Sequence, residues 1–500
     1  MKRWRILLLA ACVWLPGAAQ AADTLRIGSK RFTESYILAE VLAQQAATAG
    51  AATRISQGLG NTAIVYAALQ SGSIDLYPEY TGTIAQEILR QPGATSLPAL
   101  RQALAPLGLG VAIPLGFNDG YALAVRADDA DRLQLRTLAD LARHPELRLG
   151  LSNEFIGRAD GWKGLAGHYR LPQTPQALDH GLAYEALARR QVDVIDIYTT
   201  DAQIERRGLR VLQDGDGYFP RYDAVVLYRL DVPQRFPAAW AALQQLEGRI
   251  DEARMIRLNA RAEVDGAPFD VLAREVLTPH TADAPAATRG FLGKLLGPDL
   301  WRLTRQHLGL VAAAVALAVL VGVPLAVFAA HRPRLRTLLL GAAGLLQTVP
   351  SLALLAMLIS WLGVIGTVPA LMALALYALL PVMRNTATGL AGVPQGLRTA
   401  ALALGMTPGQ RMRLVELPLA LPVLLAGVRT ATAISIGTAT IAAFIGAGGY
   451  GERIVTGLAL NDRGLLLAGA LPAALLALVS EALFELLERA LRPRENLEEK

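Results

Sequence analysis

Long uncharged segments in the second half of the chain constrain its fold most strongly. Residues 308–330 form a run of 23 residues without a charge, and residues 337–383 form a run of 47. A spanning helix needs about 20 apolar residues, so the longer run can hold two helices joined by a turn near residues 363–366. Further apolar runs cover residues 417–437 and 464–480. The sequence therefore predicts an all-α membrane domain of about five spans.

The remainder of the chain is too polar to lie in lipid. The 500 residues include 42 acidic and 48 basic side chains, although 53% of the residues are hydrophobic. Residues 301–480 alone carry 12 Arg and three acidic residues, a formal charge of +9, which leaves −3 for the rest of a +6 chain. Arginines beside spanning helices explain this basic charge, so it does not indicate nucleic-acid binding.

The first 21 residues have the pattern of an export signal. Lys2, Arg3 and Arg5 make the first five residues basic, an apolar run of ten comes next, and small residues stand at Ala19 and Ala21. Ten apolar residues are too few to span a membrane. We expect cleavage after Ala21, which would place residue 22 outside the cytoplasm. Lipidation at Cys12, the only cysteine, and an uncleaved anchor are the alternatives.

Residues 22–283 alternate strand-like and helix-like segments, as soluble α/β domains do. Residues 24–27 alternate as a strand, and Thr33 is placed to cap a helix that ends at Gly50. More strands are expected near residues 147–151, 192–197 and 223–228, and a helix over residues 181–190. This alternation predicts mostly parallel pairing. The length favours two lobes with a ligand cleft between them. A linker is expected at residues 284–300, before a membrane domain at 301–490.

Basic residues cluster in the loops that this topology places inside the cell. An exported amino-terminal domain requires the first span to start outside. The clusters at residues 331–336, 384–413 and 489–494 then all lie on the cytoplasmic side, as the positive-inside rule requires. The sequence therefore predicts a multi-pass protein of the bacterial inner membrane, with its amino-terminal domain in the periplasm and a charged cytoplasmic tail at 491–500.

The loop at about residues 394–418 carries a recognisable motif. Its matching residues are Ala400, Ala401, Gly405, Val415, Leu417 and Pro418, whereas Thr399 stands where the pattern usually has Glu. This loop resembles the EAA loop of ABC importer permeases. The resemblance implies a short cytoplasmic helix that docks on an ATPase and passes its motion to the spans through the loop around Thr399 and Pro418. An ordinary amphipathic inside loop is the alternative.

The exported domain carries a second set of motifs, at residues 28–34, 58–62, 75–83, 121–125 and 196–201. They resemble the glycine betaine/choline-binding proteins of osmoprotectant importers. The two resemblances together cover nearly the whole mature chain. They imply a two-lobed periplasmic binding protein domain fused to a permease domain.

A quaternary ammonium group has a full charge but no N–H, so aromatic faces must hold it. Cation–π attraction contributes about 0.5–2 kcal/mol per ring. The resemblance implies a box formed by Tyr80, Tyr121, Tyr198 and Tyr222, with Asp119 as counter-charge. Tyrosines that merely pack in an α/β domain are the alternative.

A ligand carboxylate would need hydrogen-bond donors near the same box. The resemblance implies Lys30, Thr83 and Arg158 for this role, with Lys30 near the start of a helix. For Lys30 and Asp119 the alternative is an ordinary salt bridge. For Arg158 it is a simple turn over residues 157–161.

Two features of the membrane domain stand apart from these motifs. Arg429 lies inside the fourth span, where a charge must pair or face water; a pathway role and pairing with backbone carbonyls are both open. Residues 446–451 spell a dinucleotide-binding fingerprint, but they follow a membrane stretch and lack a strand–helix unit. A tight turn near the periplasmic gate is the better interpretation.

Missing motifs separate the classes of function. The sequence has no Gly-x4-Gly-Lys-Ser/Thr and no His-Glu-x-x-His. We therefore expect that this chain is not an enzyme and has no catalytic residue, metal or cofactor. ATP and Mg are expected on a partner ATPase. Five spans make half a pore, so we expect a permease homodimer with two ATPase copies; a second, different permease is the alternative.

These observations together predict the binding and permease component of an ABC importer for quaternary-ammonium solutes such as glycine betaine, choline or carnitine. Ergothioneine or an amino-acid derivative as substrate is the first alternative. A membrane-anchored ligand sensor is the second, although fewer than about twenty residues follow the last span for a signalling domain. The expected partners are a small ligand, membrane lipid and an ATPase subunit. Nucleic acid is not expected as a partner.

Overall fold

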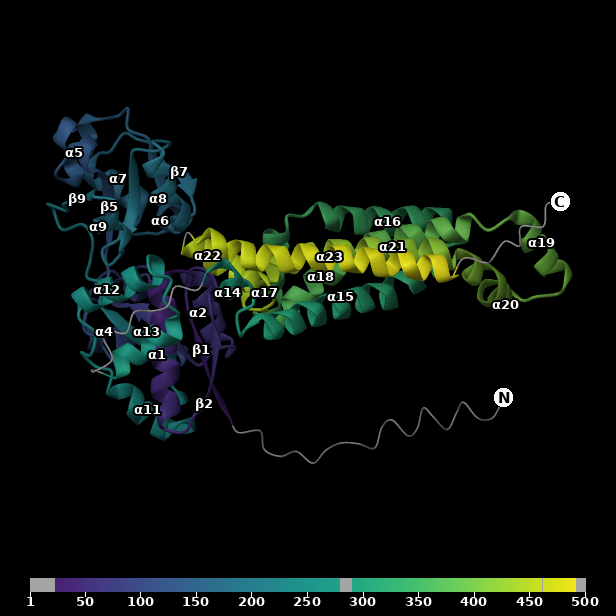
Figure 1. The fold of residues 1–500 in the computed structure, drawn as a ribbon, viewed down its shortest axis with the longest axis horizontal. Coiled ribbons are helices and arrows are strands. Elements are labelled where there is room, and N and C mark those ends of the chain that lie inside the picture. The colour runs from purple at the N-terminus through teal and green to yellow at the C-terminus, as the bar shows by residue number, and fades with distance from the viewer. Residues whose placement is uncertain (1–22, 279–289, 461, 492–500) are drawn as a thin grey trace.

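The computed structural model describes residues 23–278, 290–460 and 462–491. An α/β domain of two lobes lies at one end of an elongated bundle of helices (Figure 1). The expected signal at 1–21, the linker up to residue 289 and the tail from residue 492 lie outside the described residues.

The first lobe is built on a five-stranded sheet in the order β2-β1-β3-β10-β4. Helix α1 (Thr33–Thr48) is buried on most sides because α11, α12 and α13 cover it. The strands are β1 (Thr24–Gly28), β2 (Ala52–Ser56), β3 (Leu76–Tyr80), β4 (Leu109–Ala112) and β10 (Ala224–Arg229). The other main helices are α2 (Thr62–Gln70), α4 (Leu97–Leu104), α11 (Pro237–Gln244), α12 (Glu252–Glu263) and α13 (Phe269–Leu277).

The second lobe has a similar sheet in the order β7-β6-β8-β5-β9. Its strands are β5 (Tyr121–Arg126), β6 (Leu149–Ser152), β7 (Gln176–Leu178), β8 (Val194–Tyr198) and β9 (Leu209–Leu212). Its helices include α5 (Ala127–Leu133), α6 (Asn153–Gly157), α7 (Trp162–Tyr169), α8 (His180–Ala188) and α9 (Gln203–Arg206).

The expectation of mostly parallel pairing is wrong. In the described sheets, β1 pairs in parallel with β2 and β3, and β6 with β7 and β8. By contrast, β10 and β5 run antiparallel to both of their neighbours. The chain enters each of these two strands directly after crossing from the other lobe. Strands β5 and β10 therefore start at the sheet edge where the parallel strands end. This edge faces the other lobe in both sheets.

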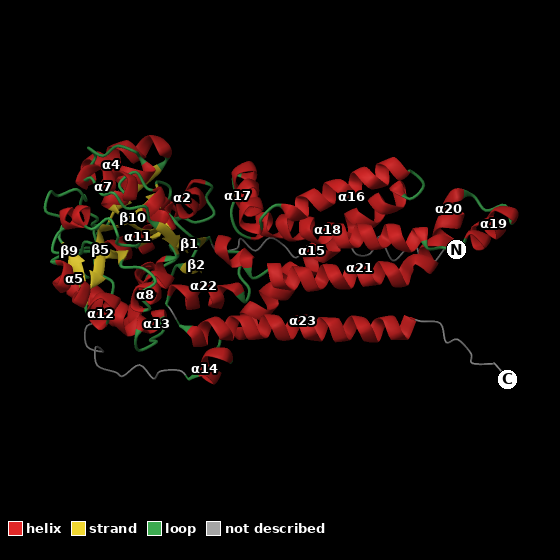
Figure 2. Cartoon of the chain, turned by 90° about the horizontal axis from the view of Figure 1, so that it is seen from above, coloured by secondary structure: helices red, strands yellow, loops and turns green. Residues whose placement is uncertain are grey.

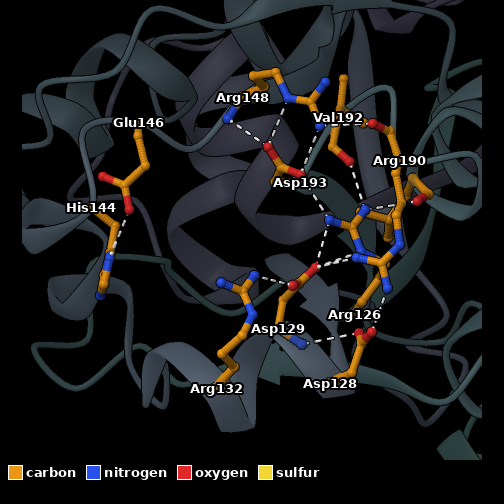
Figure 3. Close-up of polar contacts among 11 residues, drawn as sticks. Arg126, Asp128, Asp129, Arg132, His144, Glu146, Arg148, Arg190, Val192 and Asp193 are labelled. Carbon is orange, nitrogen blue, oxygen red and sulfur yellow. Dashed lines mark hydrogen bonds and ion pairs between the residues drawn. The ribbon is translucent and has the colours of Figure 1, made fainter.

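A network of ion pairs fixes the far edge of the second lobe (Figure 3). The Arg126 guanidinium donates to Asp193 at 2.7 Å and to Asp129 at 2.5 Å, and it also reaches two backbone carbonyls. Arg148 binds the same Asp193 at 2.9 Å. Partial burial opposes the charge of Asp193, but hydrogen bonds from these arginines lower its pKa to about 2. The network holds β5, α5 and β8 as one rigid unit.

The bundle contains the membrane-spanning segments. Among the described residues, four helices are long and apolar enough to cross a membrane, and a bent pair makes up to five. The four are α15 (Leu300–Ala329), α18 (Thr367–Ala391), the continuous helix Pro408–Thr438 that ends in α21 (Leu417–Thr438), and Arg463–Arg489 within α23 (Arg463–Leu491). The pair is α16 (Pro333–Thr348) with α17 (Ser351–Leu362).

The second expected span is not a straight helix, and this corrects the sequence prediction. Helices α16 and α17 meet at a bend of 101°. Val349 is extended there because Pro350 disfavours a helical residue before it and has no N–H to donate. The expected turn after this span is present: Gly363 adopts a left-handed conformation at φ 66° and ends α17, and α18 begins at Thr367.

The two ends of the bundle are different. Helices α17 and α22 (Gly451–Ala459) lie at the end beside the α/β domain, whereas α19 (Gln395–Ala403) and α20 (Pro408–Arg411) lie at the far end (Figure 2). The loop after α15 also reaches the far end, since His331 lies 3.5 Å from Arg411. Basic loops therefore gather at the end remote from the α/β domain.

Candidate functional site

Tyrosines meet where the two lobes face each other. Tyr121 begins β5 and pairs directly with Tyr198, which ends β8. Their ring centroids are 5.2 Å apart, and the ring of Tyr222, just before β10, lies 5.8 Å from Tyr121. Tyr80 ends β3 in the first lobe. The antiparallel entry of β5 thus explains why residues distant in sequence share this site.

Phe32 joins these tyrosines into one aromatic cluster. Its ring lies 5.1 Å from Tyr198 and 6.3 Å from Tyr80, so it bridges the lobes. The sequence analysis did not name this residue. Phe32 lies within the motif at residues 28–34. The need for aromatic faces around a cation could have identified it.

Lys30 is already paired with a carboxylate. Its ammonium forms an ion pair with Glu79 and lies 5.1 Å from the ring centroid of Tyr80. Both side chains of the pair are buried. A ligand carboxylate at Lys30 would therefore share the ammonium with Glu79.

Arg158 has charge and aromatic contacts within the second lobe and one hydrogen bond to the first. Its guanidinium makes two hydrogen bonds to Asp160, at 2.8 and 2.6 Å, and lies 4.9 Å from the ring centroid of Tyr121. It also donates to the Thr83 hydroxyl at 3.4 Å. The Tyr222 hydroxyl donates to the same Asp160 at 2.6 Å. Asp160, which was not predicted from the sequence, therefore holds two of the expected site residues, Arg158 and Tyr222.

The turn considered as the alternative for Arg158 is also real. The Gly161 N–H donates to the Arg158 carbonyl, and a Cβ at Gly161 would lie 1.8 Å from the carbonyl oxygen of Phe155. The turn fixes Arg158 at the end of α6, so it is compatible with the side-chain contacts of Arg158. Turn geometry and side-chain contacts thus act together.

Two buried acids lie under the aromatic cluster. Glu34 accepts hydrogen bonds from the Tyr80 hydroxyl at 2.5 Å and the Thr200 hydroxyl at 2.6 Å, and burial raises its pKa to about 7. Asp119 accepts from the Thr200 N–H, and burial together with the charge of Glu34 raises its pKa well above the usual range. A bound cation would lower both pKa values and favour the ionised acids.

A small cavity of about 30 Å³ adjoins the cluster, with room for one water-sized group. Phe32, Glu34 and Tyr198 line it together with His180 and residues from the permease. Burial disfavours the charged form of His180, but the neighbouring Asp201, 3.2 Å away, outweighs this and raises its pKa to about 9. The sequence analysis missed His180 because no spacing motif marks it.

The expected coupling residues lie on and around α19 at the far end of the bundle. Thr399 and Ala400 are exposed on this helix, and Ala401 is buried. Gly405 follows the helix in a left-handed conformation at φ 72°, and Pro418 lies in the first turn of α21. The segment also exposes three leucines, with exposed fractions of 45%, 55% and 77%: Leu397, Leu402 and Leu404.

A buried carboxylate ties α19 to the base of α21. Glu416 is 1% exposed and forms ion pairs with Arg411 at 2.9 Å and with Arg398 at 3.6 Å. His331 lies 3.7 Å from the same carboxylate. Arg398 lies in α19 directly before Thr399. Its ion pair with the buried Glu416 therefore ties α19 to the start of α21.

Arg429 pairs with carboxylates of α23. Its nearest partners are Glu481 and Glu488, the latter at 3.7 Å. The backbone-carbonyl pairing considered from the sequence is therefore replaced by an ion pair between two helices.

Residues 446–451 form a turn, as expected, between a short 3₁₀ helix and α22. Gly446, Gly448 and Gly449 all have positive φ angles, between 72° and 86°.

Two lobes with an aromatic cluster between them, beside a bundle of spanning helices, define the combined binding and membrane component of an importer. Comparison with known families agrees. Residues 23–278 match the substrate-binding domain of ABC-type glycine betaine transport systems, and the chain belongs to this family. Residues 322–493 match the inner membrane component of binding-protein-dependent transport systems.

Curated relatives match the two parts separately. The osmoprotectant import permease protein OsmW of Salmonella typhimurium is 48% identical over 196 residues, which are 38% of this chain and 91% of OsmW. A glycine-betaine-binding protein of Pseudomonas aeruginosa is 35% identical over 291 residues, 55% of this chain and 93% of that protein. The ergothioneine transport permease/ergothioneine binding protein EgtU of Helicobacter pylori is 32% identical over 281 residues, 54% of this chain and 50% of EgtU.

Proposed function

We propose that this chain binds quaternary-ammonium solutes of the glycine betaine, choline and carnitine type and carries them through the membrane, driven by a separate ATPase. One observation carries the substrate class: Tyr80, Tyr121, Tyr198 and Tyr222 converge with Phe32 between the lobes, above two buried acids.

The site chemistry fits such a ligand. Ring faces attract a cation that has no hydrogen to donate, and each ring contributes about 0.5–2 kcal/mol. Glu34 and Asp119 add negative charge once the cation favours their ionised forms. A ligand carboxylate has donors in Lys30 and Arg158, with Thr83 beside them. Glu79 and Asp160 already pair with these two cations, so a betaine carboxylate would share Lys30 or Arg158 with an internal carboxylate, whereas choline needs no such contact.

Ergothioneine is the second candidate. It carries a trimethylammonium group and a carboxylate, and the relative EgtU is named as both permease and binding protein. The aromatic cluster would hold the same cationic group in either case.

The orientation follows from charge. The α/β domain lies at one end of the bundle and the basic loops at the other (Figure 2). The positive-inside rule supports a periplasmic α/β domain and a cytoplasmic α19 in the bacterial inner membrane.

The energy source is a separate subunit. The sequence contains no P-loop, so ATP and Mg belong to a partner ATPase and the chain is not an enzyme. The exposed leucines of α19 offer an apolar docking surface for that partner. Two copies of this chain with two ATPase subunits would complete a closed pore. The Glu416 ion pairs would then pass movements of α19 to α21.

Calorimetric titration of residues 22–283 with glycine betaine, choline, carnitine and ergothioneine tests the substrate class. The relative from Pseudomonas is a separate binding protein, so this region is expected to fold alone. We expect saturable binding of one compound, binding weakened by about 2- to 30-fold in Tyr198→Ala, and unchanged binding in Tyr66→Ala, a tyrosine on α2 outside the site. A folded domain that binds none of the four would refute the substrate class.

A further inference from the structure

The cavity of about 30 Å³ beside the aromatic cluster has a polar lining, which a quaternary ammonium group cannot satisfy because it has no N–H to donate. Phe32 and Tyr198 belong both to the cluster and to the cavity lining. A group held in the cavity therefore lies next to a cation held by the rings. The size of the cavity admits one water-sized group, such as a hydroxyl.

Asn259 offers the cavity a hydrogen-bond acceptor. The side chain lies on α12, is 2% exposed and lines the cavity. Its amide nitrogen donates to the Glu34 carboxylate at 3.2 Å and to the Thr200 carbonyl at 3.1 Å. Two acceptors on one side identify that end of the amide as the nitrogen, because an amide oxygen can bond to neither. The oxygen, Oδ1, is buried and has no partner among the described residues, so a donor at this point would satisfy it.

His180 offers the same cavity a donor. Its Nε2 lies 3.2 Å from Asp201, and its ring stacks on Tyr198 with 4.4 Å between the centroids, so the imidazole is held on two sides. Burial lowers the pKa of His180, but Asp201 outweighs burial and raises it to about 9, so at neutral pH both ring nitrogens carry a proton. The other nitrogen, Nδ1, is buried, and nothing in the described part of the chain accepts its hydrogen.

Three carboxyl groups on the lining decide which charge the cavity accepts. They belong to Glu34, Asp201 and Glu263. Glu263 already accepts hydrogen bonds from the Thr33 hydroxyl at 2.7 Å and from the Gln203 amide at 3.2 Å. A ligand carboxylate in the cavity would lie beside these acids, and like charges repel strongly in a buried site. A neutral group that both donates and accepts a hydrogen bond fits the lining better.

We propose that this cavity is a hydroxyl subsite, in which a hydroxyl near the quaternary nitrogen of the ligand donates to Asn259 Oδ1 and accepts from the His180 Nδ1–H. The inference rests on the proposed function and narrows its substrate class. Choline and carnitine both carry a hydroxyl on the second carbon from the nitrogen, whereas glycine betaine has a carboxylate there and no hydroxyl. The site therefore favours hydroxylated quaternary ammonium solutes over glycine betaine.

Two matched pairs of ligands isolate the hydroxyl. In n-propyltrimethylammonium a methyl group replaces the hydroxyl of choline, and γ-butyrobetaine is carnitine without its hydroxyl. Calorimetric titration of the full chain in lipid nanodiscs measures both pairs and glycine betaine. The full chain is used because Ala459 and Leu460 of the permease complete the lining of the cavity.

We expect the hydroxylated member of at least one pair to bind about 10-fold more tightly than its analogue, and glycine betaine to bind more weakly than that compound. The analogue leaves the Asn259 oxygen and the His180 N–H unpaired in a buried site, which is the basis of the preference. A preference in the choline pair alone would identify a ligand without a carboxylate. A preference in both pairs would place the carnitine carboxylate outside the cavity.

Asn259→Leu and His180→Phe test the two hydrogen-bonding partners. Leucine removes the acceptor and keeps much of the volume, and phenylalanine removes the donor and keeps a ring beside Tyr198. In each variant the preference for the hydroxyl should fall to about 3-fold or less. The preference is a ratio measured within one variant, so a general loss of affinity cancels. His168→Phe is the matched control, since His168 stacks on Tyr169 elsewhere in the second lobe, and it should keep the full preference.

Equal binding within both pairs by the unaltered chain would overturn the hydroxyl subsite and leave the quaternary-ammonium class intact. An undiminished preference in both Asn259→Leu and His180→Phe would also overturn it, because the hydroxyl would then bind elsewhere. If none of the five compounds binds, the substrate class fails together with the subsite.

Discussion

The ion pair of Arg158 and Asp160 gives a prediction whose size follows from its burial. The two side chains are 3% and 4% exposed, and two hydrogen bonds join them. Removing one partner of a buried pair leaves an unpaired charge and costs about 3–5 kcal/mol. We therefore expect Arg158→Met to lower the free energy of unfolding of residues 22–283 by that amount.

Replacing both partners should cost much less. In Arg158→Met/Asp160→Leu no buried charge remains, and apolar substitution of a buried pair is often neutral or stabilising. The Tyr222 hydroxyl loses its acceptor in this variant, which leaves a cost of about 1–3 kcal/mol. The double variant should therefore be no less stable than Arg158→Met alone.

Urea unfolding followed by circular dichroism measures both variants. With a slope of about 3 kcal/mol per M for a domain of this size, the single variant should unfold at about 1–1.7 M less urea. A loss below about 1 kcal/mol, or costs that simply add in the double variant, would show that the pair is solvated and would refute the reasoning.

Three other variants test separate parts of the structure. Tyr198→Ala should weaken ligand binding by about 2- to 30-fold, and Tyr198→Phe should retain most affinity, because the ring face and not the hydroxyl holds the cation; titration calorimetry decides. The pKa of His180 is raised from 6.5 to about 9, so its stabilising contribution is complete below pH 6.5 and is lost as the pH rises through 9. His180→Asn should reduce the pH dependence of the melting temperature between these pH values. An unchanged dependence would contradict the ion pair with Asp201. Glu416→Ala should abolish ligand-stimulated ATP hydrolysis while ligand affinity stays unchanged; retained stimulation would show that the Arg398 and Arg411 pairs do not couple α19 to α21.

The sequence predicted the architecture because its main signals are local. Uncharged runs locate spanning helices without any knowledge of contacts, and strand–helix alternation locates the lobes. The bend at Pro350 was not predicted, although proline restricts the residue before it. Strand direction was not predictable from alternation, because β5 and β10 owe theirs to the crossings between the lobes.

The site was predictable only where a motif carries it. Tyr80, Tyr121 and Tyr198 lie in recognisable motifs. Glu34 does too, but its role depends on a hydrogen bond from Thr200 of the other lobe. Asp160 and Glu416 act through side chains that they meet only in the folded chain. Burial gives these acids their importance, and no local pattern encodes burial of a single carboxylate. The internal partners of Lys30 and Arg158 likewise appear only in three dimensions.

Solute uptake into lipid vesicles tests the central claim most directly. The chain is assembled with its ATPase, and the labelled compound that binds in calorimetry is added on the side of the α/β domain. The account predicts accumulation that requires ATP and the ATPase, and that needs higher solute concentrations in Tyr198→Ala. Ligand binding without any ATP-driven uptake would contradict it and would favour a membrane-anchored sensor.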